Sequence, residues 1–388
     1  MPKKIAIIGR GTAGALSALH FVRYCPDDEI EWHYDPNISP QAVGEGGALD
    51  FPRNLASTLD FNHLDLKNID GTFKTGILKP GWNPNGSTFF HEFPPPNLSY
   101  HFNALELQNY IFEKIKDKVQ LVEHNTNADD IDANHIIDCS GRPSELNDEF
   151  IIPKYIPVNA VHVTQCFWDY PKFDYTIAAA RPHGWVFLIP LQNRCSVGYL
   201  YNHTISDLNE IQKDVQNIFD EYNLTPSEKT NSFHFGNYYR RKNYSDRVTY
   251  NGNASFFLEP LEATSISVMI NIQRNAYDVL NQTIMPYDAN LKFCDFMAQT
   301  ENMIMMHYFA GSKFKSKFWD FAQERGAKCM ESAMLDARFA NLHILGKSVK
   351  YIYECSEKEA GEYSTWWLGS FMRNIKGLGI EKKLDKFV

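Results

Sequence analysis

A glycine-rich stretch near the start of the chain has the residue types and the spacing of a phosphate-binding loop. Residues Gly9–Gly14 read GRGTAG, and they directly follow the apolar run Ile5–Ile8. In a GxGxxG loop the glycines permit a tight turn, close approach of the backbone to a pyrophosphate, and close packing of a helix on a strand. The helix that follows such a loop offers free N–H groups and a positive dipole end to the same anion. The predicted chemistry is the binding of a dinucleotide.

The elements around this loop predict the first part of a βαβ unit. The β-branched run Ile5–Ile8 predicts a buried strand, Ala15–Tyr24 predicts a helix, and Glu29–Tyr34 predicts a second strand. Asp35 follows that strand at about the position of an acid that binds ribose. An ordinary tight turn between strand and helix is the alternative interpretation, and the motif does not distinguish FAD from NAD(P).

The composition excludes several classes of protein. The 388 residues are enough for one large domain or two interleaved ones. No segment approaches the length of an apolar membrane span, and the net charge of −9 argues against nucleic acid or an anionic membrane surface as a partner. The seven cysteines are scattered and form no CxxC pair, which predicts reduced thiols in a cytoplasm and no metal site. The apolar run Ile5–Ile8 is too short for a secretory signal, so we expect none.

Apolar periodicity predicts the remaining elements. They are the helices 101–119, 208–222 and about 264–279, the strands 120–123, 135–139 and 254–258, and a β-rich region over 157–201. Asp50–Pro52 predicts a turn at the end of the first part of the chain.

The order of these elements suits a large flavoprotein better than a compact NAD dehydrogenase. The predicted fold class is α/β: a Rossmann-like, FAD-binding βαβ flavoprotein with an inserted β-rich substrate region and a helical C-terminal part. Residues 1–315 are predicted to form the FAD-binding core, with the insertion at about 151–250. Residues 316–388 are predicted to be the helical part packed on this core.

Several stretches, in their order along the chain, resemble segments of the flavin-dependent halogenases, most closely the tryptophan-halogenase group. They are Gly9–Gly14, Ala42–Glu45, Gly71–Lys74, Tyr100–Ala104, Asp138–Gly141, Trp185–Pro190 and Phe257–Ile266. Trp185–Pro190 is similar to the family signature WxWxIP, with Phe187 in place of the second tryptophan. Each stretch alone is modest, but their order is specific.

The resemblance implies an enzyme that uses reduced FAD, oxygen and a halide to make hypohalous acid. This acid would then halogenate an electron-rich aromatic small molecule. The implied partners are the aromatic substrate, the halide and a separate flavin reductase, which supplies reduced FAD. No nucleic acid and no membrane are expected, and the formation of a homo-oligomer is left open. The expected location is the cytoplasm, or the host cytoplasm if the chain is a compact viral member of the family.

The resemblance also assigns roles to single residues. The Lys74 ammonium would polarise hypohalous acid or form a haloamine, and the Glu262 carboxylate would orient reacting groups and take up the ring proton. Thr264 and Ser265 would bind the halide at a helix start, where helix capping by Thr264 is the alternative. The cofactor-binding residues would be Gly9, Gly11, Thr12, Ala13, Gly14, Asp35, Val43, Glu45, Gly46, Asn253 and Ile266.

Two lysines lie close together in this part of the sequence. Lys74 stands in the segment that matches the family, and its alternative interpretation is a solvated surface lysine. Lys79 is the nearby competitor, and we predict that it is a surface residue.

The chain also departs from the tryptophan enzymes. Ala263 stands where they have serine, and Ser265 where they have glycine. Little sequence separates Trp82 from His101, where those enzymes build part of their substrate pocket. These differences favour a more open substrate site. They also mean that the resemblance does not assign tryptophan as the substrate. The alternatives to a halogenase are an FAD-dependent monooxygenase and a non-catalytic flavin-binding protein.

Overall fold

The computed structural model describes residues 2–39, 44–348 and 368–387, and the chain divides into two compact units. The first unit comprises Met1–Thr72, Ser99–Ile152 and Tyr238–Asp295. The second unit comprises Phe73–Leu98, Pro153–Asn237 and Phe296–Val388. Each unit is therefore assembled from three separate segments of the sequence.

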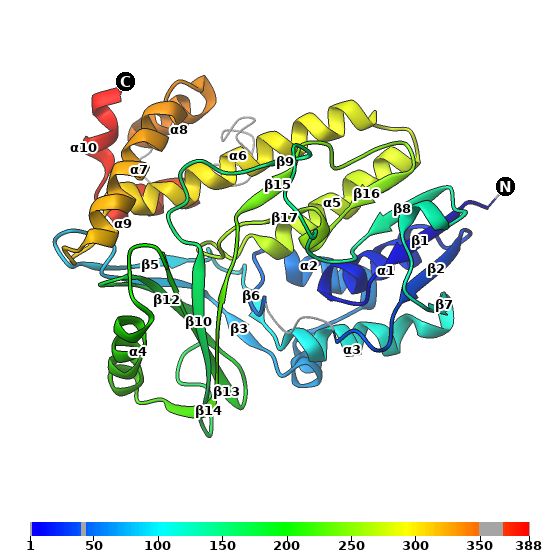
Figure 1. The fold of residues 1–388 in the computed structure, drawn as a ribbon, viewed down its shortest axis with the longest axis horizontal. Helices are drawn as coiled ribbons and strands as arrows, with labels where there is room; N and C mark the ends of the chain where they lie inside the picture. The colour runs from blue at the N-terminus through cyan, green and yellow to red at the C-terminus, as the bar shows by residue number, and fades with distance from the viewer. Residues whose placement is uncertain (1, 40–43, 349–367, 388) are drawn as a thin grey trace. The chain divides into compact units, whose positions relative to one another are not determined.

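The first unit is built on a parallel sheet of five strands in the order β16-β8-β1-β2-β7 (Figure 1). The strands are β1 (Lys4–Ile8), β2 (Glu29–Tyr34), β7 (Gln120–Glu123), β8 (His135–Asp138) and β16 (Val248–Tyr250). Successive residues of β1, Ile5, Ala6 and Ile7, are all fully buried although they point to opposite faces of the sheet. A strand with both faces covered needs apolar residues at every position, which explains the continuous apolar run.

Helices and a smaller sheet complete the first unit. The helices are α1 (Thr12–Tyr24), α2 (Asp50–Leu59), α3 (Ala104–Ile115) and α5 (Ser265–Leu280), and α1 contacts the other three (Figure 1). The smaller, antiparallel sheet contains β9 (Phe150–Ile151), β15 (Tyr238–Arg240) and β17 (Phe256–Phe257). α3 begins after Asn103, whose side chain accepts hydrogen bonds from two backbone N–H groups of its first turn.

Two local predictions for this unit are wrong. Asp50–Pro52 does not form a turn between elements; it is the start of helix α2. Pro52 is tolerated there because the backbone N–H groups of the first helical turn have no intrahelical hydrogen-bond acceptor. The strand predicted at 254–258 is reduced to β17, because a 3₁₀ turn over Gly252–Ala254 precedes it.

The second unit is built on a sheet of seven strands in the order β14-β10-β13-β12-β11-β4-β5. The strands are β4 (Gly76–Pro80), β5 (Thr88–Glu92), β10 (Ala160–Phe167), β11 (Thr176–Arg181), β12 (Gly184–Pro190), β13 (Arg194–Tyr201) and β14 (Thr225–His234). Neighbours pair antiparallel except β4 and β11. The sequence did not predict β14, since its side chains are polar and almost all exposed, and its backbone pairing with β10 holds it in place.

The other bounds complete the chain. The remaining elements before the C-terminal part are β3 (Thr72–Lys74), β6 (Ser99–His101) and α6 (Pro286–Ala310). The C-terminal part contains α7 (Lys317–Ala333), α8 (Ala337–Ser348), α9 (Leu368–Leu378) and α10 (Glu381–Leu384). The helical character predicted for this last part is confirmed over its described residues. None of the helices in the described ranges combines the length and the apolarity needed to cross a lipid bilayer.

Helix α4 (Leu208–Tyr222) has the bounds predicted from its apolar stripe. Asp207 and Glu210 form a capping box at its start, and Asn223 ends it in the left-handed conformation at φ 50°. Its apolar face packs against β13 and neighbouring strands through Ile211, Val215, Ile218 and Phe219. Burial of each such side chain stabilises the unit by about 1.5–3 kcal/mol.

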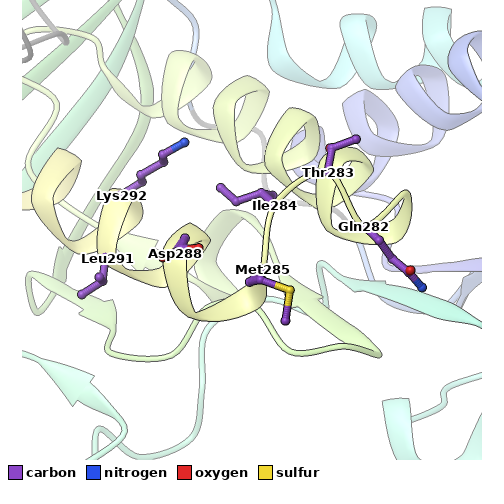
Figure 2. Close-up of a pocket in the computed structure, with 7 residues that line it drawn as sticks. All are labelled: Gln282, Thr283, Ile284, Met285, Asp288, Leu291 and Lys292. Carbon is purple, nitrogen blue, oxygen red and sulfur yellow. The ribbon is translucent and has the colours of Figure 1, made fainter.

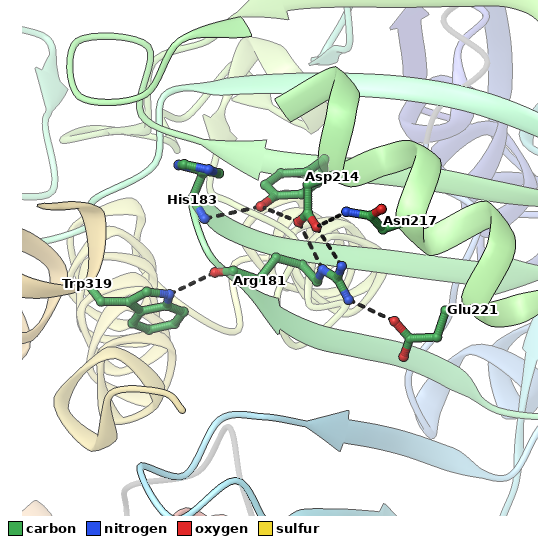
Figure 3. A network of polar contacts seen from close by, with 7 residues as sticks. Arg181, His183, Asp214, Asn217, Glu221 and Trp319 are labelled. Atoms are coloured by element: carbon green, nitrogen blue, oxygen red, sulfur yellow. Dashed lines mark hydrogen bonds and ion pairs between the residues drawn. The ribbon is translucent and has the colours of Figure 1, made fainter. Parts of the chain in front are cut away.

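A buried ion pair fastens α4 to the end of β11 (Figure 3). Arg181 donates from Nη2 to Asp214 Oδ1 at 2.6 Å and from Nε to Oδ2 at 3.0 Å. The Tyr199 hydroxyl donates to the same carboxylate at 3.0 Å, and Arg181 also donates to Glu221 at 2.9 Å. Burial by itself would raise the pKa of Asp214, but the hydrogen bonds and the charge of Arg181 lower this pKa below its ordinary value.

Asp214→Asn is expected to lower the free energy of unfolding at pH 7 by about 3 kcal/mol, because it leaves the Arg181 charge buried without its main partner. Glu221→Gln is the control, since this carboxylate is 50% exposed, and we expect a loss below about 1 kcal/mol. The depressed pKa means that the contribution of Asp214 is complete above the ordinary carboxyl pKa. It is lost as the pH falls through the lower pKa of the folded state.

Urea unfolding of the wild type and both variants, repeated at decreasing pH, measures this contribution. A gap between the wild type and Asp214→Asn that stayed constant into strong acid would contradict the assignment.

Candidate functional site

The glycine loop joins β1 to α1 as predicted. Gly9 has φ +95°, and a Cβ on it would lie 2.3 Å from the Cys139 carbonyl oxygen. A Cβ on Gly14 would lie 2.0 Å from the Gly9 carbonyl oxygen. Gly9 therefore makes the turn, and Gly14 allows the helix to approach the strand. A Cβ on Gly11 would meet no atom of the described chain within 4 Å, so the space beside this residue is open.

The N-terminus of α1 fits a bound phosphate. Gly11 is its N-cap residue, so the described chain supplies no side-chain cap there, and the first turn contains no acidic residue. Thr12 Oγ1 accepts a hydrogen bond from Gln108 Nε2 at 2.9 Å. Uncapped N–H groups and the helix dipole favour an anion. Together with the open space at Gly11, these groups fit the diphosphate of a dinucleotide such as FAD.

Two more segments meet this loop: Asp138–Gly141, which resembles a family segment, and the segment of Asn253, which was predicted to bind the cofactor. β8 pairs with β1, and this pairing brings Cys139 against Gly9. Gly252, the neighbour of Asn253, lies against the loop, because a Cβ on it would be 2.6 Å from the Ala13 Cβ. The first unit therefore brings Ala13 and the Asn253 segment together.

Asp35 directly follows β2, as predicted. Its Oδ1 accepts hydrogen bonds from the backbone N of Asn37 at 2.8 Å and from Asn37 Nδ2 at 3.0 Å. These bonds form a turn that holds the carboxylate at the end of the strand. Its contact with a ribose stays a prediction.

The segment after Gly44 runs along β6. Gly46 pairs with His101, and the Phe102 backbone N donates to the carbonyl oxygen of the buried Glu45 at 3.0 Å. His101 Nδ1 in turn lies 3.1 Å from Thr72 Oγ1. The structure thus joins three of the stretches that resemble segments of the family. Val43 lies outside the described residues.

Lys74, the last residue of β3, is fully buried. Its Nζ lies 5.6 Å from the centre of the Phe93 ring, a distance at which a cation is attracted to an aromatic face. The alternative interpretation of Lys74 as a solvated surface residue is therefore wrong.

The predicted halide and acid–base residues lie at the start of α5 in the first unit. Thr264 is the N-cap residue, but its side chain makes no capping hydrogen bond, so the capping alternative is wrong. Ser265 is half-buried, and Ile266 and Glu262 are buried. Ala263 adopts the left-handed conformation at φ 53°. Lys74 belongs to the second unit and Glu262 to the first, so their cooperation stays a prediction.

Lys79 is not the surface residue that we predicted. It is fully buried in the second unit, where its Nζ donates to His307 Nε2 at 2.6 Å and to Asn374 Oδ1 at 3.0 Å. His307 Nδ1 lies 3.0 Å from the Met303 carbonyl oxygen, which can only accept. His307 is therefore assigned as the tautomer with the proton on Nδ1, which leaves Nε2 to accept from Lys79.

The two aromatic residues of the signature segment lie on β12. Trp185 is buried, and its ring centre lies 6.5 Å from that of Trp82. Phe187 covers Gly198 of β13, because a Cβ on this glycine would lie 2.1 Å from Phe187 Cζ. Both residues are part of the packing of this sheet.

A surface hollow of about 430 Å³ lies at the connection between α5 and α6 (Figure 2). It is lined by Gln282, Thr283, Ile284, Met285, Asp288, Leu291 and Lys292. None of the predicted site residues is among them, so this hollow is separate from the predicted chemistry.

Sequence reasoning overlooked two residues near the glycine loop. Gln108 bonds Thr12, and Arg10 lies with its guanidinium 3.8 Å from the centre of the Phe112 ring. The available signal for Arg10 was its place as the charged residue within the loop.

The parallel sheet, the glycine loop and the uncapped helix N-terminus define the first unit as a Rossmann-like, dinucleotide-binding α/β fold. The sequence profile of the tryptophan halogenase family matches residues 4–117 and 105–337. The chain belongs to this family, which confirms both the resemblance and the predicted α/β fold class.

Individual relatives are distant. The tryptophan 7-halogenase RebH of Lentzea aerocolonigenes is 21% identical over 256 residues, which cover 58% of this chain and 48% of RebH. The match thus spans about half the length of that curated relative.

Two solved structures are similar over nearly all of the chain. The flavin-dependent halogenase Xcc4156 from Xanthomonas campestris has a TM-score of 0.79 at 17% identity, covering 100% of this chain and 93% of its own. The tryptophan 6-halogenase SttH from Streptomyces toxytricini has a TM-score of 0.78 at 17% identity, covering 96% of this chain and 90% of its own. At these identities the similarity establishes the fold.

Proposed function

We propose that this protein is a flavin-dependent halogenase that acts on an electron-rich aromatic small molecule. The observation that carries the proposal is the complete burial of Lys74, the lysine of the Gly71–Lys74 segment that resembles the family, within the part of the chain that the family profile matches. Lysine is seldom fully buried, because an ammonium group loses its hydration there. A buried ammonium can bind a reactive oxidant away from bulk water.

The chemistry divides between the cofactor and the side chains. Reduced FAD supplies, with oxygen, the oxidising power that turns a halide into hypohalous acid. Lys74 donates a hydrogen bond to the oxygen of this acid and polarises its bond to the halogen. The ring carbon bonds to the halogen as the oxygen–halogen bond breaks, and the departing hydroxide takes a proton from the Lys74 ammonium and leaves as water. The Glu262 carboxylate takes up the ring proton, and proton exchange with solvent then restores both side chains.

The halide and the cofactor have separate places in this proposal. The start of α5, at Thr264 and Ser265, binds the halide through backbone N–H groups, which the absence of a Thr264 cap supports. The glycine loop and Asp35 bind FAD, and a separate flavin reductase supplies it in reduced form. We place this reaction in the cytoplasm, where thiols such as Cys25 and Cys166 stay reduced.

The test is a turnover assay with the full chain, FAD, a flavin reductase and NADH. Chloride, bromide and iodide are supplied separately with a panel of phenols and indoles, and products are read by mass spectrometry. We expect a mass gain that matches the halide supplied. A gain of one oxygen would instead indicate a monooxygenase. Bound FAD without any product from the panel would favour a non-catalytic flavin-binding protein.

A further inference from the structure

Arg10, the charged residue of the glycine loop, is held on aromatic rings. Its Cζ lies 3.8 Å from the centre of the Phe112 ring on α3 and 5.3 Å from the centre of the Tyr34 ring at the end of β2. The two rings meet edge to face at 6.0 Å. The Tyr34 hydroxyl donates to Glu123 at 2.7 Å, which fixes its ring. The loop, a strand and a helix therefore fix the place of this guanidinium.

The hydrogen-bonding capacity of this guanidinium is not used within the part of the chain that the structure describes. An arginine has five N–H donors, and no described residue accepts a hydrogen bond from Arg10 or forms an ion pair with it. Arg240 of the same unit shows the contrast, since it lies over the Tyr250 ring at 3.5 Å but donates to the Ala254 carbonyl oxygen at 2.8 Å. Arg10 is thus a positioned cation whose donors are available to a ligand.

The position of Arg10 indicates which ligand group it meets. It stands between the turn at Gly9 and the open space at Gly11, and it lies beside the end of β2, which Asp35 follows. In dinucleotide-binding folds the carboxyl ends of these strands meet the pyrophosphate and the ribose of the adenosine half. A guanidinium offers paired donors to phosphate oxygens and a flat face for stacking.

We propose that the Arg10 guanidinium binds the ADP half of FAD and thereby selects FAD over flavins that lack this half. The inference rests on the FAD binding proposed above. The full positive charge of the Arg10 guanidinium adds to the partial positive charge of the α1 N-terminus, so both attract the same diphosphate.

The test measures flavin affinity rather than turnover. The wild type, Arg10→Ala, Arg10→Lys and Lys114→Ala are prepared as flavin-free full chains and titrated with FAD and with FMN, which lacks the adenosine part. Flavin fluorescence reports binding, and ADP is then used to displace FAD. Lys114 is the matched control, because its ammonium lies 5.2 Å from the Tyr110 ring centre on the same helix but its side chain is exposed.

Arg10→Ala is expected to raise the Kd of FAD by roughly tenfold to a hundredfold, the range for the loss of a hydrogen bond to a charged group. The Kd of FMN stays the same, and the dissociation constant of ADP, calculated from the displacement with the measured Kd of FAD, rises by a similar factor. Arg10→Lys keeps the charge and shows a smaller loss, while Lys114→Ala matches the wild type.

Three results overturn the inference. An unchanged FAD affinity in Arg10→Ala overturns it alone. Equal weakening of FAD and FMN, together with a lower free energy of unfolding of the flavin-free chain, shows a structural arginine instead. A wild-type chain that binds no FAD overturns both this inference and the proposed function.

Discussion

Lys74→Ala is expected to lower the rate of halogenation by about a hundredfold to a thousandfold or more while the affinity for FAD stays unchanged. The variant removes the ammonium that polarises the oxygen–halogen bond, and alanine supplies no donor. FAD affinity is spared because the glycine loop and Asp35 lie in the first unit, whereas Lys74 belongs to the second. Steady-state turnover with a flavin reductase, together with a flavin titration of the same preparation, measures the two quantities.

Lys79→Met is the matched control for this variant. Both lysines are fully buried in the second unit, and the Lys79 ammonium donates hydrogen bonds to His307 and Asn374. Methionine keeps the apolar stem of Lys79 and removes its ammonium, so we expect a lower free energy of unfolding and little change in turnover per FAD-loaded protein. Undiminished halogenation by Lys74→Ala would contradict the assignment of this lysine.

Gly9→Ala and Gly11→Ala are expected to fail in different ways. In Gly9→Ala the new Cβ would lie 2.3 Å from the Cys139 carbonyl oxygen, in a backbone conformation at φ +95° that L-residues rarely adopt. We expect a loss of several kcal/mol in the free energy of unfolding, on the order of 3 kcal/mol or more. The turn itself cannot form without movement of β8.

Gly11→Ala is expected to keep the wild-type stability and to lose FAD. Its φ of −70° suits any residue, and the added methyl group would meet no described atom within 4 Å. The methyl group would instead occupy the space that the diphosphate needs, so the Kd of FAD should rise by about a hundredfold. Urea unfolding and flavin fluorescence separate the two variants. Normal FAD affinity in Gly11→Ala would contradict the placement of the diphosphate at this loop.

Local patterns predicted the parts of the structure whose causes are local. The first strand and helix follow from the run Ile5–Ile8 and the glycine loop, and α4 follows from one apolar stripe between Asp207 and Asn223. Both ends of α4 carry their own capping residues, so its bounds could be predicted to the residue. The remaining site residues were predicted from the order of the family segments, and their roles stay predictions.

Three features escaped prediction because they depend on partners far away in the sequence: the burial of Lys79, the strand β14 and the place of the Arg10 side chain. The Lys79 ammonium donates hydrogen bonds to His307, 228 residues later, and to Asn374, 295 residues later. The residues near Lys79 in the sequence therefore give no sign of these acceptors. β14 has no apolar alternation, because the backbone of β10 rather than a core holds it. Arg10 was overlooked because a GxGxxG motif is read for its glycines, whereas the role of this side chain depends on Phe112 of another element.

The interleaving of the two units has a consequence for synthesis on the ribosome. The parallel sheet of the first unit lacks its edge strand β16 until Val248–Tyr250 has emerged from the ribosome, although its glycine loop is synthesised long before that strand. The second unit has begun by then, but it ends only in the C-terminal helices. No single cut of the polypeptide therefore releases an intact unit, and the nascent chain must hold exposed strand edges while the rest is translated.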